Sequence, residues 1–294
     1  MVINNYKGGQ LANRVIAFAH LIANSIEYKY ELCNPEFDEY CSYFEATSQG
    51  KFDNNPISTT LYHNHFADRA FSRIFRLWAD ITHLIFTSTP CYKLWRIFKS
   101  HDKKQLLFDM NDAAFVKDAV TKTVIIEGWL FRDRASVHKH QDAIRKYFTP
   151  IEKYRLEVAV IMQQARQAAA AVIGVHIRRG DYIRFAGGKW YYSDEVYAEK
   201  MLSLQQKFNQ EGKKCIFLIC SNEPVNETNY PSTLQLITGD RHFITDLYCL
   251  AACDAIIGAP STFSLWASFY GKVPYVHIQN AQDAIELGAY NQLC

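Results

Sequence analysis

An apolar, strand-like run near the middle of the chain ends in charged side chains, in the sequence GVHIRRGDY at 174–182. On a strand His176 and Arg178 project to one face, whereas Arg179 takes the other. A buried strand does not end in such charges unless they have partners. One guanidinium group could bind a diphosphate through paired, charge-assisted hydrogen bonds, and the other could pair with a carboxylate such as Asp181. A purely internal network of ion pairs is the alternative interpretation.

The second candidate is the turn in GAPSTFSLW at 258–266. Pro260 follows a strand-like run, and Ser261 and Thr262 then begin a helical pattern. The first turn of a helix carries unpaired N–H groups and the positive end of the helix dipole, which suit a phosphate. Ser261 could equally be only the N-cap of that helix, and on the turn alone this simpler interpretation is favoured.

Two weaker candidates lie elsewhere in the chain. Asp246 begins the helical pattern DLYCLAAC, where an acidic residue ordinarily caps the helix or complements its dipole. Its carboxylate could also accept hydrogen bonds from the N1 and N2 donors of a guanine. The loop GGQLANR at 8–14 precedes a helical pattern, although a Gly-Gly loop is weak evidence by itself.

The elements that must position these residues form a repeating pattern. Apolar, strand-like runs at 171–177, 215–221 and 255–259 alternate with helical patterns at 194–211, 245–253 and 261–270. Such alternation predicts a parallel α/β sheet, and ligands of these sheets bind beyond the carboxyl ends of the strands. The polar residues above occupy those ends, as does Ser221 after the second run. The second half of the chain is therefore predicted to bind a nucleotide.

The first half of the chain is less regular. Its expected elements are a short strand at Val2 and Ile3, a helix over about 11–27, loops and short elements over 33–65, a strand at 123–131, a helix that ends before Pro150, and a long helix over about 151–170. We expect two domains, 1–165 and 166–294.

Composition bounds the class of protein. A net charge of +2 over 294 residues gives no reason to expect nucleic acid as a partner. No apolar run approaches the roughly 20 residues that span a bilayer, and the N-terminus shows no signal-peptide pattern. Two-residue spacings typical of zinc or redox sites are absent from the cysteine pairs 215/220 and 249/253, so we expect buried, reduced thiols and a cytoplasmic location.

Taken together, GQLANRVIAFAHLIA near the start, HIRRGDY in the middle and the late STF resemble the alpha-1,2-fucosyltransferase family and the wider group of inverting enzymes that use GDP-fucose. The family motif His-x-Arg-Arg-x-Asp is matched in full at 176–181, and the motifs together span 9–263. The resemblance implies a GT-B fold, in which two Rossmann-like α/β domains with parallel sheets face each other. Residues 1–165 would be the acceptor-side domain, and 166–294 would bind the GDP-sugar donor.

The resemblance also implies roles for individual residues. Arg178 would bind the β-phosphate, and His176 would hold the guanosine together with Asp246. Ser261, Thr262 and Phe263 would wrap the diphosphate, with Arg179 and Ser221 also among the residues that bind substrate. Asn13 would reach the phosphate or the fucose from the first domain. The family loop usually continues Gly-Asn-Gln, whereas this chain reads Ala12-Asn13-Arg14.

The implied reaction is the inverting transfer of L-fucose from GDP-fucose to a galactoside hydroxyl, with an alpha-1,2 linkage. No Asp-x-Asp pair occurs in the chain, so we expect metal-independent chemistry without a cofactor beyond the co-substrate. Arg178 and Asp181 are the expected catalytic residues, and Glu127 and Asp133 are further candidates for a general base. The alternatives are a transferase for another nucleotide sugar and a protein that binds a GDP-sugar or a glycan without transferring it.

The acceptor expected from the resemblance is an oligosaccharide or a lipid-linked glycan of polysaccharide biosynthesis. Residues 69–99 alternate aromatic and basic side chains at helical intervals. A pair of amphipathic surface helices is the simpler interpretation of this pattern. The alternative is peripheral contact with the inner face of a membrane, where lipid-linked acceptors reside.

Overall fold

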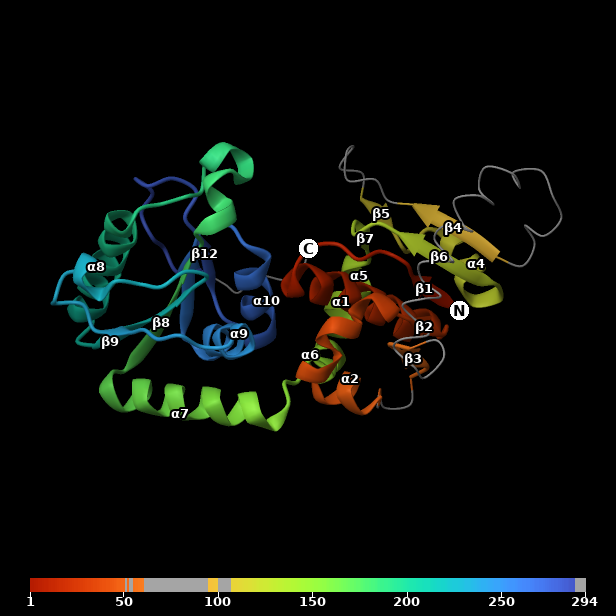
Figure 1. Cartoon of the computed structure of the whole chain (residues 1–294), viewed down its shortest axis with the longest axis horizontal. Helices are drawn as coiled ribbons and strands as arrows, with labels where there is room; N and C mark the ends of the chain where they lie inside the picture. Colours follow the sequence, from red (N-terminus) through yellow and green to blue (C-terminus); the bar gives the residue numbers. More distant parts are fainter. Residues whose placement is uncertain (51, 53–54, 61–94, 100–106, 289–294) are drawn as a thin grey trace. The chain divides into compact units, whose positions relative to one another are not determined.

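The computed structural model describes residues 1–50, 52, 55–60, 95–99 and 107–288, with the backbone alone for 95–99 (Figure 1). The chain divides into two compact units, Met1–Ile151 and Glu152–Leu293. The predicted boundary at residue 165 falls inside helix α7 (Glu152–Ala168), whereas the two units divide between Ile151 and Glu152. This helix belongs with the second unit because Arg166 pairs with Asp254 at 3.1 Å and the ring of Tyr154 stacks on that of His242.

The first unit is built on a five-stranded parallel sheet. In spatial order its strands are β3 (Ile57–Ser58), β2 (Leu32–Cys33), β1 (Val2–Asn4), β6 (Thr123–Glu127) and β4 (Trp95–Lys99). A separate parallel pair joins β5 (Phe108–Asp109) to β7 (Phe131–Arg132). The helices are α1 (Leu11–Tyr28), the 3-10 helix η1 (Pro35–Tyr43), α2 (Glu45–Gln49), α4 (Ala113–Thr121), α5 (Arg134–Lys139) and α6 (Gln141–Tyr147).

An aromatic cluster holds the helices of the first unit together. Phe18 of α1 lies 5.1 Å from Phe37 and 5.9 Å from Phe148, measured between ring centroids. Phe44 completes the cluster at 5.4 Å from Phe148, and all four rings are fully buried. Helix α1 therefore forms where its apolar residues recur on the core side, which confirms the predicted helix at about 11–27.

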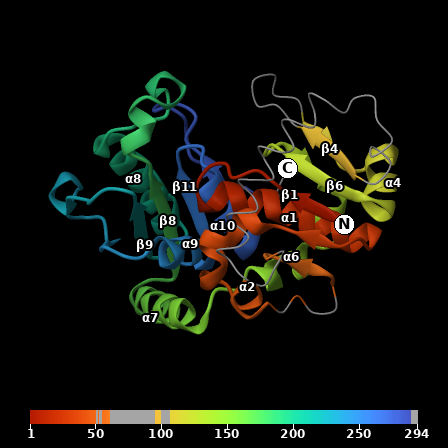
Figure 2. The ribbon, with the colours of Figure 1, turned by 45° about the vertical axis from the view of Figure 1, so that its right-hand side comes forward.

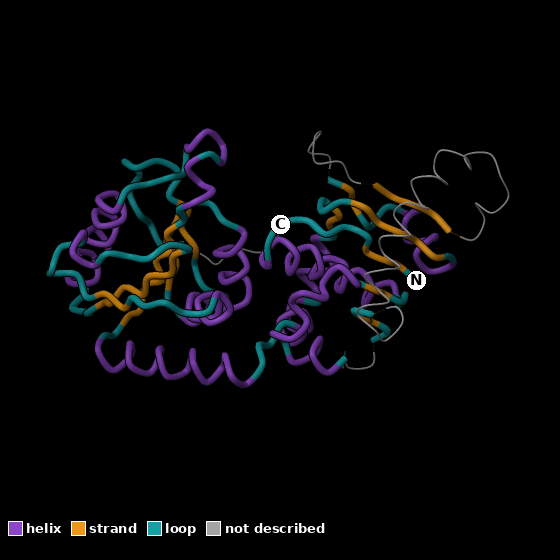
Figure 3. Tube along the Cα trace, viewed as in Figure 1, coloured by secondary structure: helices purple, strands orange, loops and turns teal. Residues whose placement is uncertain are grey.

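The second unit is also built on a parallel five-stranded sheet, drawn in orange in Figure 3. Its strands are β10 (Leu236–Ile237), β9 (Cys215–Ser221), β8 (Ala171–Ile177), β11 (Ala255–Gly258) and β12 (Tyr275–His277), and its longer helices are α7, α8 (Asp194–Gln210), α9 (Phe243–Ala252) and α10 (Thr262–Gly271). Short 3-10 helices lie at η4 (Gly180–Ile183), η5 (Phe185–Gly188) and η6 (Glu227–Asn229).

Helices cover both faces of this sheet, with α8 on one face and α9 and α10 on the other (Figure 2). All seven residues of β8 are buried, as expected for a central parallel strand that is covered on both faces. The three strand-like runs and the three helices predicted for the second half are all confirmed, within one or two residues at most ends.

Two predictions for the first half were wrong in part. The run at 123–131 forms two strands, because the chain turns at Gly128, whose φ of 126° is readily available only to glycine. Residues 95–99 were expected to be helical but form β4, which pairs with β6. Both interpretations of the rest of the 69–99 segment, surface helices or a membrane patch, fall on residues outside those described.

Two expectations from composition can be compared with the described part of the chain. No helix there is long and apolar enough to cross a bilayer. The described cysteines are buried and none forms a disulfide, as expected from their apolar surroundings: Cys33, Cys41, Cys215, Cys220, Cys249 and Cys253.

Candidate functional site

Arg178 and Arg179 directly follow β8, and their side chains lie on opposite faces of the sheet. His176 and Arg178 lie on the face covered by α10. Nδ1 of His176 is 2.6 Å from Oγ of Ser264, and its ring centroid is 5.0 Å from that of Phe263. Burial, with the nearby charge of Arg178, lowers the pKa of His176 to about 3, so its ring is neutral at physiological pH.

Close packing of two strands fixes this end of the sheet. Gly258 of β11 is paired with His176 of β8. A Cβ atom on Gly258 would lie 2.5 Å from the carbonyl oxygen of His176, which is backbone and cannot move aside. The glycine therefore lets β11 approach β8 closely just before the chain enters the turn at Ser261.

Tyr182 joins Arg178 to the turn that begins α10. The guanidinium carbon of Arg178 lies 4.8 Å from the centre of the Tyr182 ring, and the Tyr182 hydroxyl donates a 2.6 Å hydrogen bond to the carbonyl of Pro260. Burial raises the pKa of Tyr182, although the charge of Arg178 and a hydrogen bond with Ser261 oppose the rise. Arg178 and the Ser261 turn, 83 positions apart in sequence, thus contact one tyrosine.

Arg178 has hydrogen-bonding capacity that its neighbours do not use. One terminal nitrogen donates a 2.7 Å hydrogen bond to Asp181, whose carboxylate side chain is 62% exposed. Its Nε is buried and has no hydrogen-bond partner among the described residues. A buried donor without a partner is costly, so this atom marks a place where an oxygen acceptor of a ligand would fit.

Thr262 and Phe263 follow Ser261 in the first turn of α10. The Ser261 hydroxyl accepts a hydrogen bond of 3.2 Å from the backbone N–H of Phe263, so Ser261 is the N-cap of α10. The simpler interpretation of Ser261, that it caps the helix, is therefore confirmed. It leaves the remaining N–H groups of the first turn beside Tyr182 and Arg178.

Arg179 lies on the opposite face and forms an internal ion pair. Its guanidinium group donates to the carbonyl of Tyr192 and to Oδ1 of Asp194. Asp194 also accepts hydrogen bonds from Tyr230 and Asn229 at 2.8 and 2.7 Å. Burial alone would raise the pKa of Asp194, but these hydrogen bonds and the charge of Arg179 hold it below its usual value. Arg179 thus has internal partners, and its expected contact with substrate stays a prediction.

Asp246 has a partner that the sequence did not reveal. Helix α9 begins at Phe243, earlier than expected, so Asp246 lies within its first turn. Its Oδ1 accepts a 2.6 Å hydrogen bond from Nε of Arg241, and Arg241 also donates to the carbonyl of Ile219 at 2.5 Å. Burial raises the pKa of Asp246, and the charge of Arg241 opposes that rise. No pattern in the irregular segment before α9 singled out Arg241.

The two remaining sequence-predicted binding residues lie in different units. Ser221 ends β9 beside Ile177 of β8, and its hydroxyl accepts a 3.2 Å hydrogen bond from the N–H of Glu223. Asn13 is in the first turns of α1, next to Gly9, where a Cβ atom would lie 2.2 Å from the Asn13 amide nitrogen. Gly9 has a φ of 69°, so the loop before α1 depends on glycine at this position.

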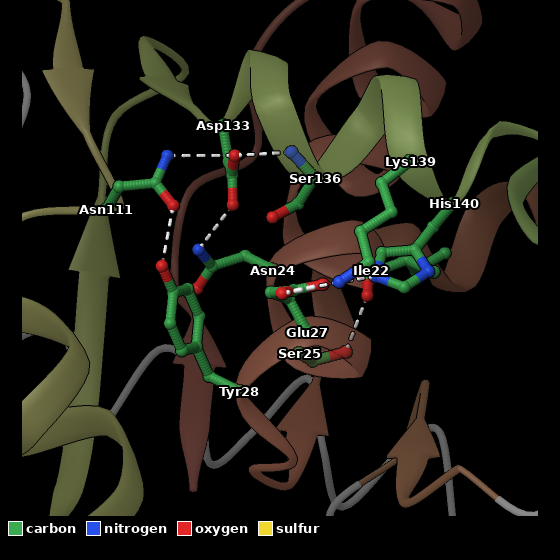
Figure 4. A network of polar contacts seen from close by, with 10 residues as sticks. All are labelled: Ile22, Asn24, Ser25, Glu27, Tyr28, Asn111, Asp133, Ser136, Lys139 and His140. Carbon is green, nitrogen blue, oxygen red and sulfur yellow. Dashed lines mark hydrogen bonds and ion pairs between the residues drawn. The ribbon is translucent and has the colours of Figure 1, made fainter.

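The structure excludes Asp133 as a general base, because its carboxylate is fully buried in a network of polar contacts (Figure 4). Its Oδ1 accepts hydrogen bonds from the N–H of Ser136 and the amide of Asn111, and its Oδ2 accepts one from Asn24 at 2.7 Å. Asp133 is the N-cap of α5. Glu127 ends β6 and accepts a 3.3 Å hydrogen bond from the Asn5 amide.

A family model matches this chain. The model of Glycosyl transferase family 11 matches residues 129–287, which is more than half of the chain. Galactoside alpha-(1,2)-fucosyltransferase 1 of Sus scrofa is 25% identical over 200 residues, covering 63% of this chain and 51% of that protein. The protein of the same name from Homo sapiens is 24% identical over 159 residues, covering 49% and 42%. The chain thus spans about half the length of the curated relatives it matches.

Solved structures with the same fold share little sequence with this chain. FUT1 of Arabidopsis thaliana, as a mutant in complex with GDP, has a TM-score of 0.60 at 14% identity and covers 93% of this chain and 69% of that one. The fucosyltransferase NodZ from Bradyrhizobium has a TM-score of 0.56 at 11% identity, covering 99% and 98%. POFUT1 in complex with GDP-fucose has a TM-score of 0.52 at 13% identity, covering 92% and 94%. These similarities confirm the expected GT-B fold with parallel α/β sheets.

Proposed function

The chain belongs to glycosyl transferase family 11, and we propose that it is a fucosyltransferase that moves L-fucose from GDP-fucose to a hydroxyl of a galactoside. The reaction inverts the configuration at the anomeric carbon, needs no metal ion and gives an alpha-1,2 linkage. Two kinds of similarity support the donor: POFUT1 is named in complex with GDP-fucose, and the curated relatives are named as galactoside alpha-(1,2)-fucosyltransferases.

One observation carries this proposal: a guanidinium group and a helix N-terminus are both in contact with Tyr182. A pyrophosphate placed there would accept hydrogen bonds from Arg178, including its unpartnered Nε, and from the first turn of α10. Ser261, Thr262 and Phe263 would surround the same position. Fixed donors of this kind stabilise negative charge without reorganising during the reaction.

Recognition of guanine fits the arrangement around Asp246. Arg241 occupies one oxygen of this carboxylate. Burial raises the pKa of Asp246, and the charge of Arg241 opposes that rise. The other oxygen would accept hydrogen bonds from N1 and N2 of guanine. The neutral ring of His176 would contact the guanosine from β8, with its orientation fixed by Ser264.

In the proposed reaction the acceptor hydroxyl oxygen bonds to the anomeric carbon of fucose while the bond from that carbon to the β-phosphate oxygen breaks. The electron pair leaves with GDP, and Arg178 and the α10 N-terminus stabilise its growing negative charge. This cationic environment takes the role that a divalent metal ion has in other transferases. Asp181 orients Arg178 through their hydrogen bond. Its carboxylate, which is 62% exposed, would receive the hydroxyl proton.

The proposal is tested by incubating the protein with GDP-fucose and a panel of galactosides, with and without EDTA. We expect release of GDP and, by NMR linkage analysis, an alpha-L-fucoside at O2 of galactose, with no loss of rate in EDTA. A β-L-fucoside would contradict inversion, and faster turnover of GDP-mannose would identify another donor. Thermal stabilisation by GDP without turnover of any acceptor would identify a binding protein instead.

A further inference from the structure

A buried ion pair, Arg241 with Asp246, joins the end of β9 to the first turn of α9. Nε of Arg241 donates a 2.6 Å hydrogen bond to Oδ1 of Asp246, and a terminal nitrogen donates one of 2.5 Å to the carbonyl of Ile219. The two side chains are only 10% and 12% exposed. Asp246 is the proposed contact to guanine, so Arg241 lies one side chain away from the base.

The backbone on both sides of Arg241 is fixed. Gly239 has a φ of 143°, which residues with a side chain rarely adopt, and a Cβ atom there would lie 3.5 Å from a terminal nitrogen of Arg241. On the other side, the ring centroid of His242 lies 4.8 Å from that of Tyr154 and 4.2 Å from that of Phe243. The guanidinium group is therefore held in place against the carboxylate.

The carboxylate of Asp246 is held by one of its two oxygens. Arg241 occupies Oδ1, and no N–H or O–H group in the described part of the chain donates to Oδ2. The thiol of Cys220, a weak donor, also contacts the carboxylate. An ionised carboxylate with acceptor capacity to spare suits a base with two adjacent N–H donors. Guanine presents such donors at N1 and N2, whereas hypoxanthine has only the donor at N1.

The charge on Asp246 depends on Arg241. Burial raises the pKa of Asp246 and the neighbouring Asp240 adds to the rise, while the charge of Arg241 opposes it more strongly than any other group. The other titratable groups on elements packed against α9, and on α9 itself, are Cys220 of β9, Cys249 of α9, Glu157 of α7, His176 of β8 and Tyr270 of α10. Without its cation the buried carboxyl group would bind a proton at higher pH. It would then accept hydrogen bonds less well.

We propose that Arg241 is a positioning residue that gives the nucleotide site its preference for guanine, because it holds the charged carboxylate of Asp246 with one oxygen free for N1 and N2 of the base. The inference rests on the proposed function in taking GDP as the nucleotide. A purely structural ion pair is the alternative, since removing one partner of a buried pair is costly whatever the site binds.

The test measures the affinities for GDP and inosine diphosphate (IDP) by calorimetric titration between pH 6 and pH 8. IDP lacks the N2 amino group and carries the same diphosphate, so the ratio of the two affinities reports the contact at N2. In wild type we expect GDP to bind at least about 10-fold more tightly at each pH, as for one hydrogen bond to a charged group. In Arg241→Gln the ratio should fall to about threefold or less at pH 6 and rise with pH, because Asp246 ionises as the pH rises.

Three further variants separate positioning from stability. Arg166→Gln, the matched control, breaks another arginine–aspartate pair of this unit, at the amino-terminal end of β8, and should leave the ratio unchanged. Arg241→Lys keeps the charge and should recover most of the ratio. Asp246→Asn should lose the ratio at each pH, and adding Arg241→Gln to it should change the affinity for GDP by no more than about twofold, because Arg241 acts through Asp246.

Equal losses of affinity for GDP and IDP in Arg241→Gln would show a structural role and overturn the inference, as would a ratio in Arg241→Lys as low as in Arg241→Gln. If Arg241→Gln does not melt cooperatively, the comparison of Asp246→Asn with the double variant decides, because neither leaves a buried carboxylate unpaired. A further fall in GDP affinity there overturns the positioning role, and equal affinities support it. Wild type that binds GDP and IDP equally overturns this inference alone, whereas wild type that binds neither also overturns the proposed function.

Discussion

The ends of the two parallel sheets have the same architecture and opposite chemistry. At the carboxyl end of the second sheet lie a neutral, buried histidine, an arginine with an unpartnered Nε and a helix N-terminus. At that of the first lie the hydrogen-bonded amides of Asn4 and Asn34, the indole ring of Trp129, and Arg14, which pairs with Glu39. The same kind of strand end therefore carries an unpartnered buried donor in one unit, and a paired amide and a paired cation in the other. Both arginines have a carboxylate partner, but Nε of Arg178 has no hydrogen-bond partner among the described residues, whereas Nε of Arg14 donates to the carbonyl of Gly9.

Replacing Arg178 gives the largest expected effect, because it removes the charge that distinguishes the second sheet end. In Arg178→Ala we expect kcat to fall about 10²–10³-fold, by comparison with the loss of one donor to a developing negative charge. KM for the acceptor should change little. Steady-state kinetics with GDP-fucose and a galactoside measures both. The control is Lys214→Ala, which removes an exposed cation at the opposite, amino-terminal end of the same sheet.

An unchanged kcat in Arg178→Ala, in a variant that still melts cooperatively, would remove the main contrast between the two sheet ends. A fall in kcat in Lys214→Ala of the same size would point to a general effect of net charge.

The buried carboxylate of Asp133 has a structural role, so its loss should lower the free energy of unfolding. In Asp133→Asn we expect the unit to lose about 1–3 kcal/mol, since the carboxylate accepts hydrogen bonds from Ser136, Asn111 and Asn24. These hydrogen bonds outweigh burial and lower the pKa of Asp133 in the folded state. The stability from this group is therefore present above its unfolded pKa, near 4, and is lost as pH falls through the lower folded value.

Urea denaturation of wild type and Asp133→Asn between pH 7 and pH 3 measures this contribution. The difference in free energy of unfolding should narrow as the pH falls. A constant difference across that range would mean that the ionised state of Asp133 contributes nothing, while a difference that widens would contradict the sign. Asp142→Asn, on the exposed side of α6, is the control.

Replacing Arg179 gives the smallest expected effect on activity. The comparison with Arg178→Ala tests whether the two neighbouring arginines after β8 have different roles. In Arg179→Met we expect a loss of about 1–3 kcal/mol in the free energy of unfolding, because Asp194 remains largely buried without its cation. The affinity for GDP per folded molecule should stay within about threefold of wild type, since this side chain faces away from His176. Calorimetric titration with GDP below the melting temperature measures that affinity. A GDP affinity more than threefold weaker than that of wild type would support a contact between Arg179 and the nucleotide.

Sequence reasoning reached much of this site because strand alternation and helix starts are local properties. Arg178 and Arg179 follow β8 directly, and strand alternation carried two residues past its end separates them. The Pro260-Ser261-Thr262 turn marks the start of α10. That the two lie together follows from parallel topology, since parallel strands bring their carboxyl ends to one edge. The roles of all these residues as contacts to substrate remain predictions, and so do those of Ser221, Asp246 and Asn13.

What the sequence could not indicate depends on tertiary partners. Asp194 begins a helix, where an acidic residue needs no further explanation, and only the fold brings Arg179 to it. Arg241 lies in an irregular segment, and only the fold shows that it donates a hydrogen bond to Asp246. Residues 95–99 are a short apolar and basic run that suits either a helix or a strand. Pairing with β6 decides in favour of the strand.

The buried cysteines can report unfolding of the protein, because they become reactive only when the interior is exposed. Burial raises the pKa of the Cys41 thiol to about 11 and that of Cys249 to about 12, and it raises those of Cys215, Cys220 and Cys253 as well. Thiolate, the form that alkylating reagents attack, is therefore scarce at these positions while the chain is folded. Peptide mapping of alkylated Cys41 and Cys249 at increasing urea would then show which unit exposes its interior first, without any label introduced by mutation.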